Sequence, residues 1–400
     1  MSLMICTSGK GRQTMEGKNI VHFLKADSGD CFLIQLADKN CILIDGGYKS
    51  TFQSELKPLL KELSNQNYRV ALFIVTHFDE DHIGGAITFI EENGDSNNPN
   101  IIPVDNIWFN GIFQLIMRDK KMLNHLVEQL SEAQKDVYQI LADQLSGLIG
   151  VGSGKISATQ AEAFETLCVE NHYQMNAGGI NGQVINGASL QIGDCIIRCL
   201  NPDDMQLNRL SRWIDKKCID CLGNDYELDK NGFIAFLQRI LIVTGKEIPQ
   251  CTGVWKIASD IPNIDDWVNT SSLAPMNEVN RSSIVVEVKY KDIRMLFMGD
   301  SESKDWVANA HTSYDLVKIS HHGTTKPNLE ILEKIKIKSA LISTNGRKNQ
   351  HPEDDLLARM VKAGIENIYF NYDIRRKNDL QKIQEQYSFK THFGEKEIII

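Results

Sequence analysis

Long apolar runs and an excess of positive charge are both missing from this 400-residue chain. No uninterrupted apolar stretch reaches the roughly 18 residues that a membrane-spanning helix needs, so we predict no such helix and no membrane partner. Lys and Arg together number 43 against 52 Asp and Glu, which gives a formal net charge of −9. This balance argues against a general polyanion-binding surface, although it leaves room for a local basic groove.

The nine cysteines are scattered and no signal peptide precedes them. This pattern predicts reduced thiols in a cytoplasmic protein. Cys218 and Cys221 form a C-x-x-C motif, but no second pair stands at zinc-finger spacing. We expect packing cysteines here, with a structural zinc or redox pair as the alternative.

A phosphate-binding loop is also missing. The segment GLIGVGSGKIS has Ile149 where the first Gly of that motif belongs, and Ile156 follows Lys155 where Ser or Thr is needed. We interpret the segment as a flexible linker.

Short apolar segments bounded by Gly, Asp and Asn alternate with helical patterns, which predicts an α/β layered domain. Helices are expected at 52–66 and 82–93. Strands are expected within 19–26, 31–37, 41–47, 70–76, 188–202, 282–290, 293–300, 315–323, 339–346 and 367–372. The chain therefore divides into two α/β halves that insertions separate.

One insertion has a helical apolar stripe between residues 113 and 148, and a second probable helix lies at 231–245. The stripe predicts an amphipathic insertion packed on the domain, with a homodimer or partner face as the alternative. Its members recur every three or four residues: Leu123, Leu126, Leu130, Ala133, Val137, Leu141, Leu145 and Leu148.

The segment THFDEDHIGG, residues 76–85, places two histidines and three acidic residues directly after an apolar strand. His77, Asp79, Asp81 and His82 are short-armed ligands that a strand-to-helix loop would bring together. Without a cation, buried carboxylates so close would repel one another and lose their hydration. The pattern predicts a divalent metal site; a solvated loop with a helix N-cap explains one Asp, but not two His flanking two Asp.

A second group of candidate ligands also follows predicted strands: Asp300, His321, His322 and His351. Five of the ten histidines fall in the two groups. A single His after a strand is usually a core or capping residue. The repeated placement favours convergence on one pocket, because open α/β sheets keep their chemistry at the carboxyl ends of strands.

THFDEDHIGG resembles the HxHxDH signature of the metallo-β-lactamase fold, in the HxDxDH form typical of the soluble hydrolase domain of ComEC-type competence (DNA-uptake) proteins. Other segments are similar in the same order: DSGDCFLI with LIDGG, NRSSIVVEV leading into MLFMGD, VKISHHGTTKPN, and LISTNGRKNQHPEDDLLARM. The likeness covers residues 20–110 and 276–375.

The resemblance implies an α/β fold, the four-layer αβ/βα metallo-β-lactamase sandwich with helical insertions. It implies one domain over 18–400, with halves at 18–110 and 276–400. The insertions would then be 111–182 and 203–275.

The resemblance also implies that His77, Asp79, Asp81 and His82 bind metal, and that Asp300 bridges two ions. Asp45 would orient a ligand histidine, with a plain Asp-Gly turn as the alternative.

Further candidates for metal ligands or phosphate contacts are His321, His322 and His351, and the roles stay open among them. Many family members carry another His before the bridging Asp. This chain has Asn, Arg and Ser at 280–282 instead, which predicts a loosely held or differently coordinated ion. Because Asp79 replaces a His, manganese and iron become plausible beside zinc. We expect two divalent ions, zinc or manganese, with iron as a further option.

Two such ions would activate a shared hydroxide for hydrolysis. Asp81 would bridge metal and water, and His322 or His351 would protonate the leaving group or contact an oxygen of the substrate. Several polar residues offer donors to a phosphate, with ordinary loop polarity as the alternative: Thr324, Thr325, Lys326, Ser343, Asn345 and Arg347.

The first hypothesis is a metal-dependent phosphodiesterase or nuclease acting on a phosphodiester or nucleotide, nucleic acid included. The alternatives are a hydrolase of small esters, thioesters or lactams, and a partner-regulated defence or interaction protein with a metal site. A free-standing version in bacteria would serve nucleic-acid turnover or defence against invading DNA.

Overall fold

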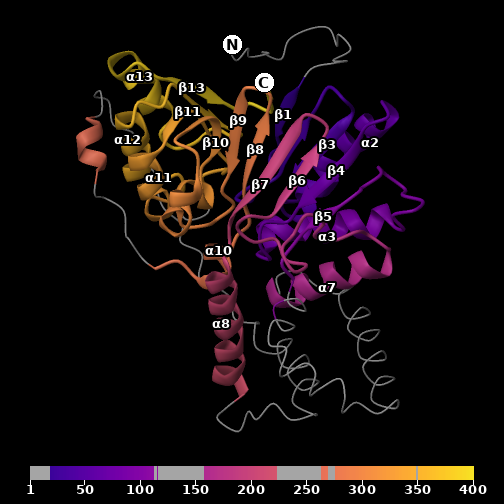
Figure 1. Cartoon of the computed structure of the whole chain (residues 1–400). Helices are drawn as coiled ribbons and strands as arrows, with labels where there is room; N and C mark the ends of the chain where they lie inside the picture. Colours follow the sequence, from indigo (N-terminus) through magenta and orange to yellow (C-terminus); the bar gives the residue numbers. More distant parts are fainter. Residues whose placement is uncertain (1–18, 112–114, 116–156, 223–262, 269–274, 348–349) are drawn as a thin grey trace, which may run out of the picture.

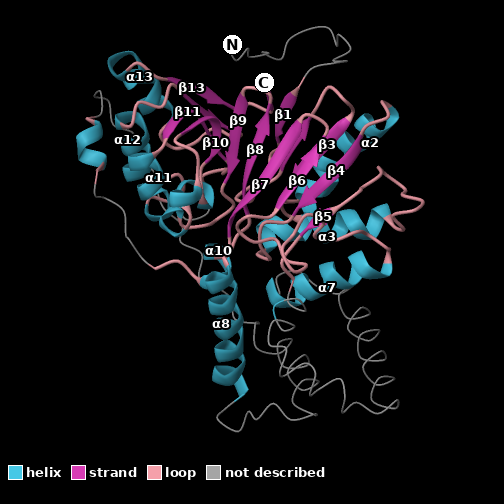
Figure 2. Cartoon of the chain, in the orientation of Figure 1, coloured by secondary structure: helices cyan, strands magenta, loops and turns pink. Residues whose placement is uncertain are grey.

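The computed structural model describes residues 19–111, 115, 157–222, 263–268, 275–347 and 350–400. Within them the expected α/β class is confirmed: two β-sheets face each other, and helices cover the outer faces (Figure 1, Figure 2). Among the described helices, none is both long and apolar enough to cross a membrane.

The first sheet has six strands in the order β14-β1-β2-β3-β4-β5. β3, β4 and β5 run parallel, and the remaining neighbours are antiparallel. The strands are β1 (Ile20–Phe23), β2 (Phe32–Gln35), β3 (Asn40–Ile44), β4 (Arg69–Ile74), β5 (Ile107–Trp108) and β14 (Glu397–Ile399).

The second sheet has eight strands in the order β13-β12-β11-β10-β9-β8-β7-β6, and β9 to β13 run parallel. Its strands are β6 (Ser189–Ile192), β7 (Cys195–Asn201), β8 (Val285–Tyr290), β9 (Ile293–Phe297), β10 (Ser313–Lys318), β11 (Lys336–Ile342), β12 (Asn367–Phe370) and β13 (Lys390–Phe393).

Side chains from the facing sides of both sheets form one apolar layer. Phe32 of β2 meets Phe297 of β9 edge to face, with ring centroids 5.5 Å apart. β4 is buried along Val70–Ile74, as expected for a central strand whose two faces are both covered. Continuous apolar runs therefore specify the central strands.

Helices on the outer face of the first sheet pack on a second apolar cluster. Phe89 of α3, for example, lies 5.6 Å from Phe73 of β4 between ring centroids. These helices are α1 (Lys49–Thr51), the π-helical turn η1 (Phe52–Leu56), α2 (Lys57–Asn65), α3 (Glu80–Asn93) and α7 (Ser157–Glu170).

A third cluster joins the second sheet to its outer helices (Figure 1). These are α11 (Leu329–Lys334), α12 (Asp354–Lys362) and α13 (Lys377–Tyr387). The shorter elements are η2 (Ile264–Trp267), α10 (Glu278–Arg281), η3 (Ser303–Asp305), η4 (Val307–Asn309), η5 (His321–Gly323) and η6 (Lys326–Asn328). α8 (Asp204–Leu222) extends away from the sheets (Figure 1).

The two halves expected from the sequence do not coincide with the two sheets. β6 and β7 precede the second half along the chain, yet they extend the second sheet. β14 follows the second half's other strands, yet it pairs with β1 at the edge of the first sheet. Each sheet therefore depends on segments from distant parts of the sequence.

Several expectations lie outside the described residues: the apolar stripe over 123–148, the helix at 231–245, and the linker up to residue 156. Cys218 and Cys221 lie on α8, but their side chains are not among those described. Five other cysteines are buried free thiols: Cys31, Cys41, Cys168, Cys195 and Cys199.

Candidate metal centre

The carboxyl ends of parallel strands from both sheets meet at one place. Asp45 follows β3, His77 follows β4, and Asp300 follows β9. His321 and His322 follow β10 on the short turn η5. Two groups of residues more than 200 positions apart in the sequence thereby form one cluster.

The expected strand-to-helix loop is shorter than predicted. α3 begins at Glu80 with Asp79 as its N-cap, so Asp81 and His82 lie in its first turn rather than in a loop. Acidic residues are favoured there by the positive end of the helix dipole. The Asp79 side chain does not cap the helix; its Oδ2 lies 3.7 Å from His77 Nε2.

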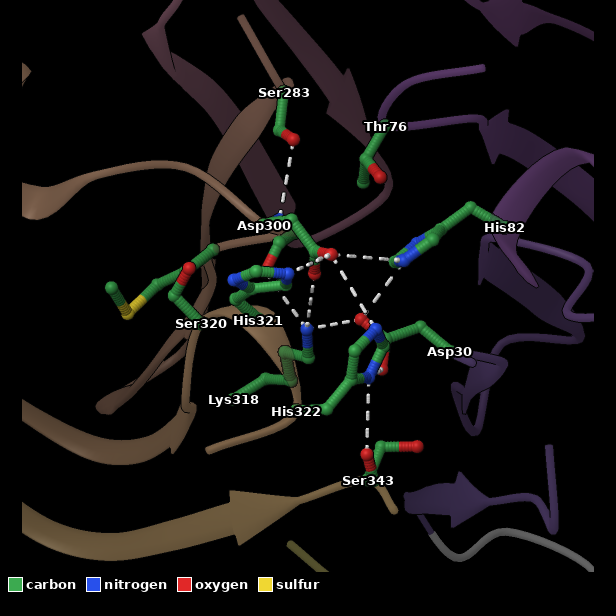
Figure 3. A network of polar contacts seen from close by, with 12 residues as sticks. Asp30, Thr76, His82, Ser283, Asp300, Lys318, Ser320, His321, His322 and Ser343 are labelled. Atoms are coloured by element: carbon green, nitrogen blue, oxygen red, sulfur yellow. Dashed lines mark hydrogen bonds and ion pairs between the residues drawn. The ribbon is translucent and has the colours of Figure 1, made fainter. Parts of the chain in front are cut away.

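One carboxylate oxygen, Asp300 Oδ2, lies within 4.0 Å of four imidazole nitrogens; those of His82, His321 and His322 are seen in Figure 3. The Nε2 atom is 3.4 Å away in His322 and 3.5 Å away in His82. It is 3.9 Å away in His321 and 4.0 Å away in His77. Asp81 Oδ2 lies 3.6 Å from His322 Nε2.

Several polar atoms of this cluster are buried without a hydrogen-bond partner among the described residues. They include Nε2 of His77, His82 and His322, and Oδ1 of Asp300. A buried polar atom left unpaired costs stability, so such atoms need a ligand. Nitrogen and carboxylate donors at this spacing suit a divalent transition metal.

Four overlapping donor sets lie among the described residues: two include Asp30, and the other two combine the expected ligands. Ligand atoms of His77, His82 and Asp300 lie within 4.8 Å of one another, and so do those of Asp81, His82 and His322. Asp300 contacts members of both sets, which is the position that a bridging carboxylate requires. The donors present therefore fit a divalent metal site.

Contacts at Nδ1 hold the rings of His82 and His322 so that Nε2 is directed toward Asp300. Asp45 Oδ2 lies 2.8 Å from His82 Nδ1, and the Thr76 backbone N–H donates to Asp45 Oδ1 at 2.7 Å. His322 Nδ1 lies 3.1 Å from the Ser343 carbonyl, which can only accept, so in the neutral ring the lone pair is on Nε2. Such outer hydrogen bonds fix the tautomer and direction of metal-binding histidines.

Asp30 and Lys318 complete the cluster, although sequence reasoning did not single them out. Both side chains are about 1% exposed, and they form an ion pair. Asp30 Oδ1 lies 3.5 Å from His322 Nδ1, and Lys318 Nζ lies 3.7 Å from Asp300 Oδ1. The available signal was a lone lysine in the apolar run before His321.

The charges of the cluster depend on one another. Burial alone would raise the pKa of Asp300, but His322, His82 and His321 hold it well below its ordinary value. Burial opposes the charge on Asp30 too, yet Lys318 and His322 lower its pKa to about 2. Burial disfavours a proton on His322, but Asp300 and Asp30 raise its pKa to about 9. Without metal, protons on His82 and His322, whose pKa values are both raised, balance the carboxylates.

We predict that His322 makes the metal-free protein less stable at alkaline pH. Its folded pKa of about 9 exceeds the ordinary 6.5, so its contribution is complete below pH 6.5 and is lost as pH rises through 9. The shift corresponds to at most about 3 kcal/mol. Thermal melts of chelator-treated protein should show Tm falling over this range.

His322→Gln should flatten that fall, whereas His311→Gln, which changes an exposed histidine, should leave it unchanged. Equal slopes in wild type and His322→Gln would contradict the prediction.

The other two expected histidines, His321 and His351, make different contacts. His321 Nε2 lies 3.4 Å from Asn280 Nδ2, and its Nδ1 lies 3.2 Å from Thr324 Oγ1. Asn280 stands in the region where the resembled family carries a further His. His351 is mostly buried, with its ring centroid 5.9 Å from that of His321, and it belongs to none of the donor sets found among the described residues.

The expected substrate contacts separate into two groups. Ser343 is fully buried and donates to the Gly29 carbonyl at 2.6 Å, so its hydroxyl supports the fold. Asn345 Nδ2 donates to Asp27 Oδ1 at 3.1 Å. Thr324 and Lys326 are partly exposed beside His321 along the chain.

One protein-family model matches the first part of the chain. The sequence model of the metallo-beta-lactamase superfamily matches residues 24–96, which include Asp30, Asp45 and the first ligand group. No curated protein matches the chain at a significant level.

Similar solved structures include the metallo-beta-lactamase fold protein YhfI from Bacillus subtilis, at 8% identity and a TM-score of 0.36. That comparison covers 96% of this chain and 99% of the other. A mutant of the CmlA beta-hydroxylase is 9% identical with a TM-score of 0.34, covering 96% of this chain and 53% of the other. Residues 24–96 thus match the metallo-beta-lactamase superfamily, and the two facing sheets with outer helices are consistent with its fold.

Proposed function

We propose that this chain is a metal-dependent hydrolase that cleaves phosphodiesters, either as a nuclease or on nucleotides. The observation that carries the proposal is the convergence of three unpartnered, buried Nε2 atoms, those of His77, His82 and His322, on the Asp300 carboxylate. Bound divalent ions at such a site lower the pKa of water and neutralise charge that develops on phosphorus.

The candidate residues divide into those that would hold metal and those that would face the substrate. His77, His82 and His322 are at most 6% exposed and would hold metal together with Asp300. The Asp79 and His321 side chains are about 30% exposed, and that of Asp81 is 15% exposed. Asp81, which forms a donor set with His82 and His322, would also hold metal, and substrate would approach over Asp79, Asp81 and His321.

Proton transfer to a leaving group falls to His321 or His351 rather than to His322. The His322 ring is buried, and its Nδ1 is engaged by the Ser343 carbonyl. His321 has the exposure that contact with a substrate requires. Thr324 and Lys326, near it in sequence, would supply a hydroxyl and a cationic donor for phosphate oxygens.

Preference for a phosphodiester rests on the resemblance to ComEC-type hydrolase domains together with these donors. The net charge of −9 favours short or single-stranded substrates over a long duplex. Hydrolysis of small esters is the second candidate, because Ser343 and Asn345 are engaged within the fold and leave fewer donors for phosphate.

The test combines metal analysis with hydrolysis. Purified protein should contain divalent metal and cleave bis(p-nitrophenyl) phosphate and single-stranded DNA with Mn²⁺ or Zn²⁺. Asp81→Ala should reduce the rate at least about 100-fold, because loss of a ligand should exceed the 10- to 100-fold cost of losing an outer contact. Glu80→Ala is the matched control, since Glu80 is the exposed neighbouring carboxylate in the same helical turn.

Metal-dependent cleavage that Asp81→Ala retains in full would contradict this assignment of the site. Bound metal with cleavage of p-nitrophenyl acetate alone would favour the ester hydrolase. Protein that binds no divalent metal under any of these conditions would exclude the proposed function.

A further inference from the structure

Lys318 is a buried lysine inside a cluster of candidate metal ligands. It is the last residue of β10, and its side chain is about 1% exposed. Its Nζ donates to the Gly299 carbonyl at 2.8 Å and pairs with Asp30. A buried ammonium is costly unless it is paired and hydrogen-bonded. Three oxygens surround Lys318 Nζ: the Gly299 carbonyl oxygen, a carboxylate oxygen of Asp30, and Asp300 Oδ1, which lies 3.7 Å away.

The two oxygens of Asp300 face different partners. Oδ2 faces the Nε2 atoms of the histidines at 3.4 to 4.0 Å, whereas Oδ1 faces Lys318 (Figure 3). The terminal torsion of an aspartate is broad, so this orientation needs an external restraint. The Asp300 backbone N–H lies 3.2 Å from Ser283 Oγ, which fixes the main chain but not the carboxylate.

Asp30 holds Lys318 from the other sheet. It lies two residues before β2, and its backbone N–H donates to the Asp81 carbonyl at 3.1 Å. Its carboxylate lies on the Nδ1 side of His322 and His82, at 3.5 and 3.8 Å. Asp30 therefore lies on the Nδ1 side of both rings, away from the Nε2 atoms that face Asp300.

We propose that Lys318 is a positioning residue of the metal centre. Its ammonium holds the Asp300 carboxylate with Oδ2 turned to the metal ions, and Asp30 keeps Lys318 in place. This inference rests on the proposed metal-dependent function. The competing view is that Lys318 and Asp30 form only a structural ion pair between the two sheets.

A double variant separates the two views. Lys318→Met alone would leave Asp30 buried without a partner, which destabilises a fold whatever else the pair does. Asp30→Asn combined with Lys318→Met removes both charges and leaves the net charge unchanged. The matched control is Asp265→Asn with Lys362→Met, the same changes in an exposed ion pair.

The measurements are the Tm of the metal-free protein and the Kd for Mn²⁺ and Zn²⁺ by equilibrium dialysis with elemental analysis. We expect the double variant to keep a Tm close to that of wild type and to bind metal about 10- to 100-fold more weakly. The control pair should bind metal as wild type does.

Metal binding equal to that of wild type in the folded double variant would overturn the proposal and leave a structural pair. If that variant does not fold, Asp30→Leu with Lys318→Met, which removes the buried polar groups altogether, is measured instead and read in the same way. Collapse of both variants would also count against a positioning role. Failure of wild type to bind metal in the same dialysis would defeat the proposed function itself.

Discussion

Asp300→Asn should deprive the protein of tightly bound divalent metal and lower the rate of hydrolysis at least about 100-fold. The Asn side chain has nearly the same shape, but it has one oxygen in place of two and carries no charge. At the wild-type position, Oδ2 lies within 4.0 Å of four imidazole nitrogens, and Oδ1 faces Lys318. No other described carboxylate contacts all of these groups.

Elemental analysis after dialysis and the rate of bis(p-nitrophenyl) phosphate cleavage measure this effect. Asp292→Asn, which changes an exposed residue between β8 and β9, is the control. The metal-free variant should also lose roughly 3 kcal/mol or more of stability, because His82, His322 and Lys318 lose their shared anion. Wild-type metal content in Asp300→Asn would show that the bridging position lies elsewhere.

Gly85→Ala should destabilise the protein by about 3 kcal/mol or more, whereas Gly84→Ala on the same helix should be neutral or stabilising. A Cβ on Gly85 would lie 2.0 Å from the Gly46 carbonyl oxygen, a backbone atom that cannot move away alone. Overpacking of this kind costs 1 to 3 kcal/mol and sometimes more. A Cβ on Gly84 meets nothing closer than 3.5 Å, and Ala favours a helix over Gly by up to about 1 kcal/mol.

The measurements are thermal or denaturant unfolding and metal affinity for both variants. Because Gly46 follows Asp45, moving α3 away from this turn should lengthen the contact between Asp45 and His82 as well. Gly85→Ala should therefore bind metal more weakly than Gly84→Ala does. Equal stability of the two variants would contradict the close approach of α3 to residues 46–48.

Local pattern was enough to predict most strands. The apolar runs of β4, β9 and β10 are specified by neighbouring residues, and the structure confirms strands there. The beginning of α3 was predicted too late, although Asp79 followed by Glu80 and Asp81 is a typical helix start. The interpretation of the four candidate ligands as loop residues hid that signal.

Long-range pairing was not predictable in the same way. Asp30 and Lys318 are 288 positions apart, and nothing near either of them indicates that they meet. The engagement of Ser343 likewise depends on the Gly29 carbonyl, which needs a donor only because the two sheets face each other here. Contacts that depend on how the sheets face each other cannot be read from local sequence.

The position of β14 has a consequence for synthesis. Among the described strands it is the last along the sequence, and its partner β1 is the first. On the ribosome, the free edge of β1 stays exposed until Glu397–Ile399 has left the exit tunnel, and exposed edges are sites of aggregation. The first sheet can therefore gain this edge strand only after more than 350 further residues have been made.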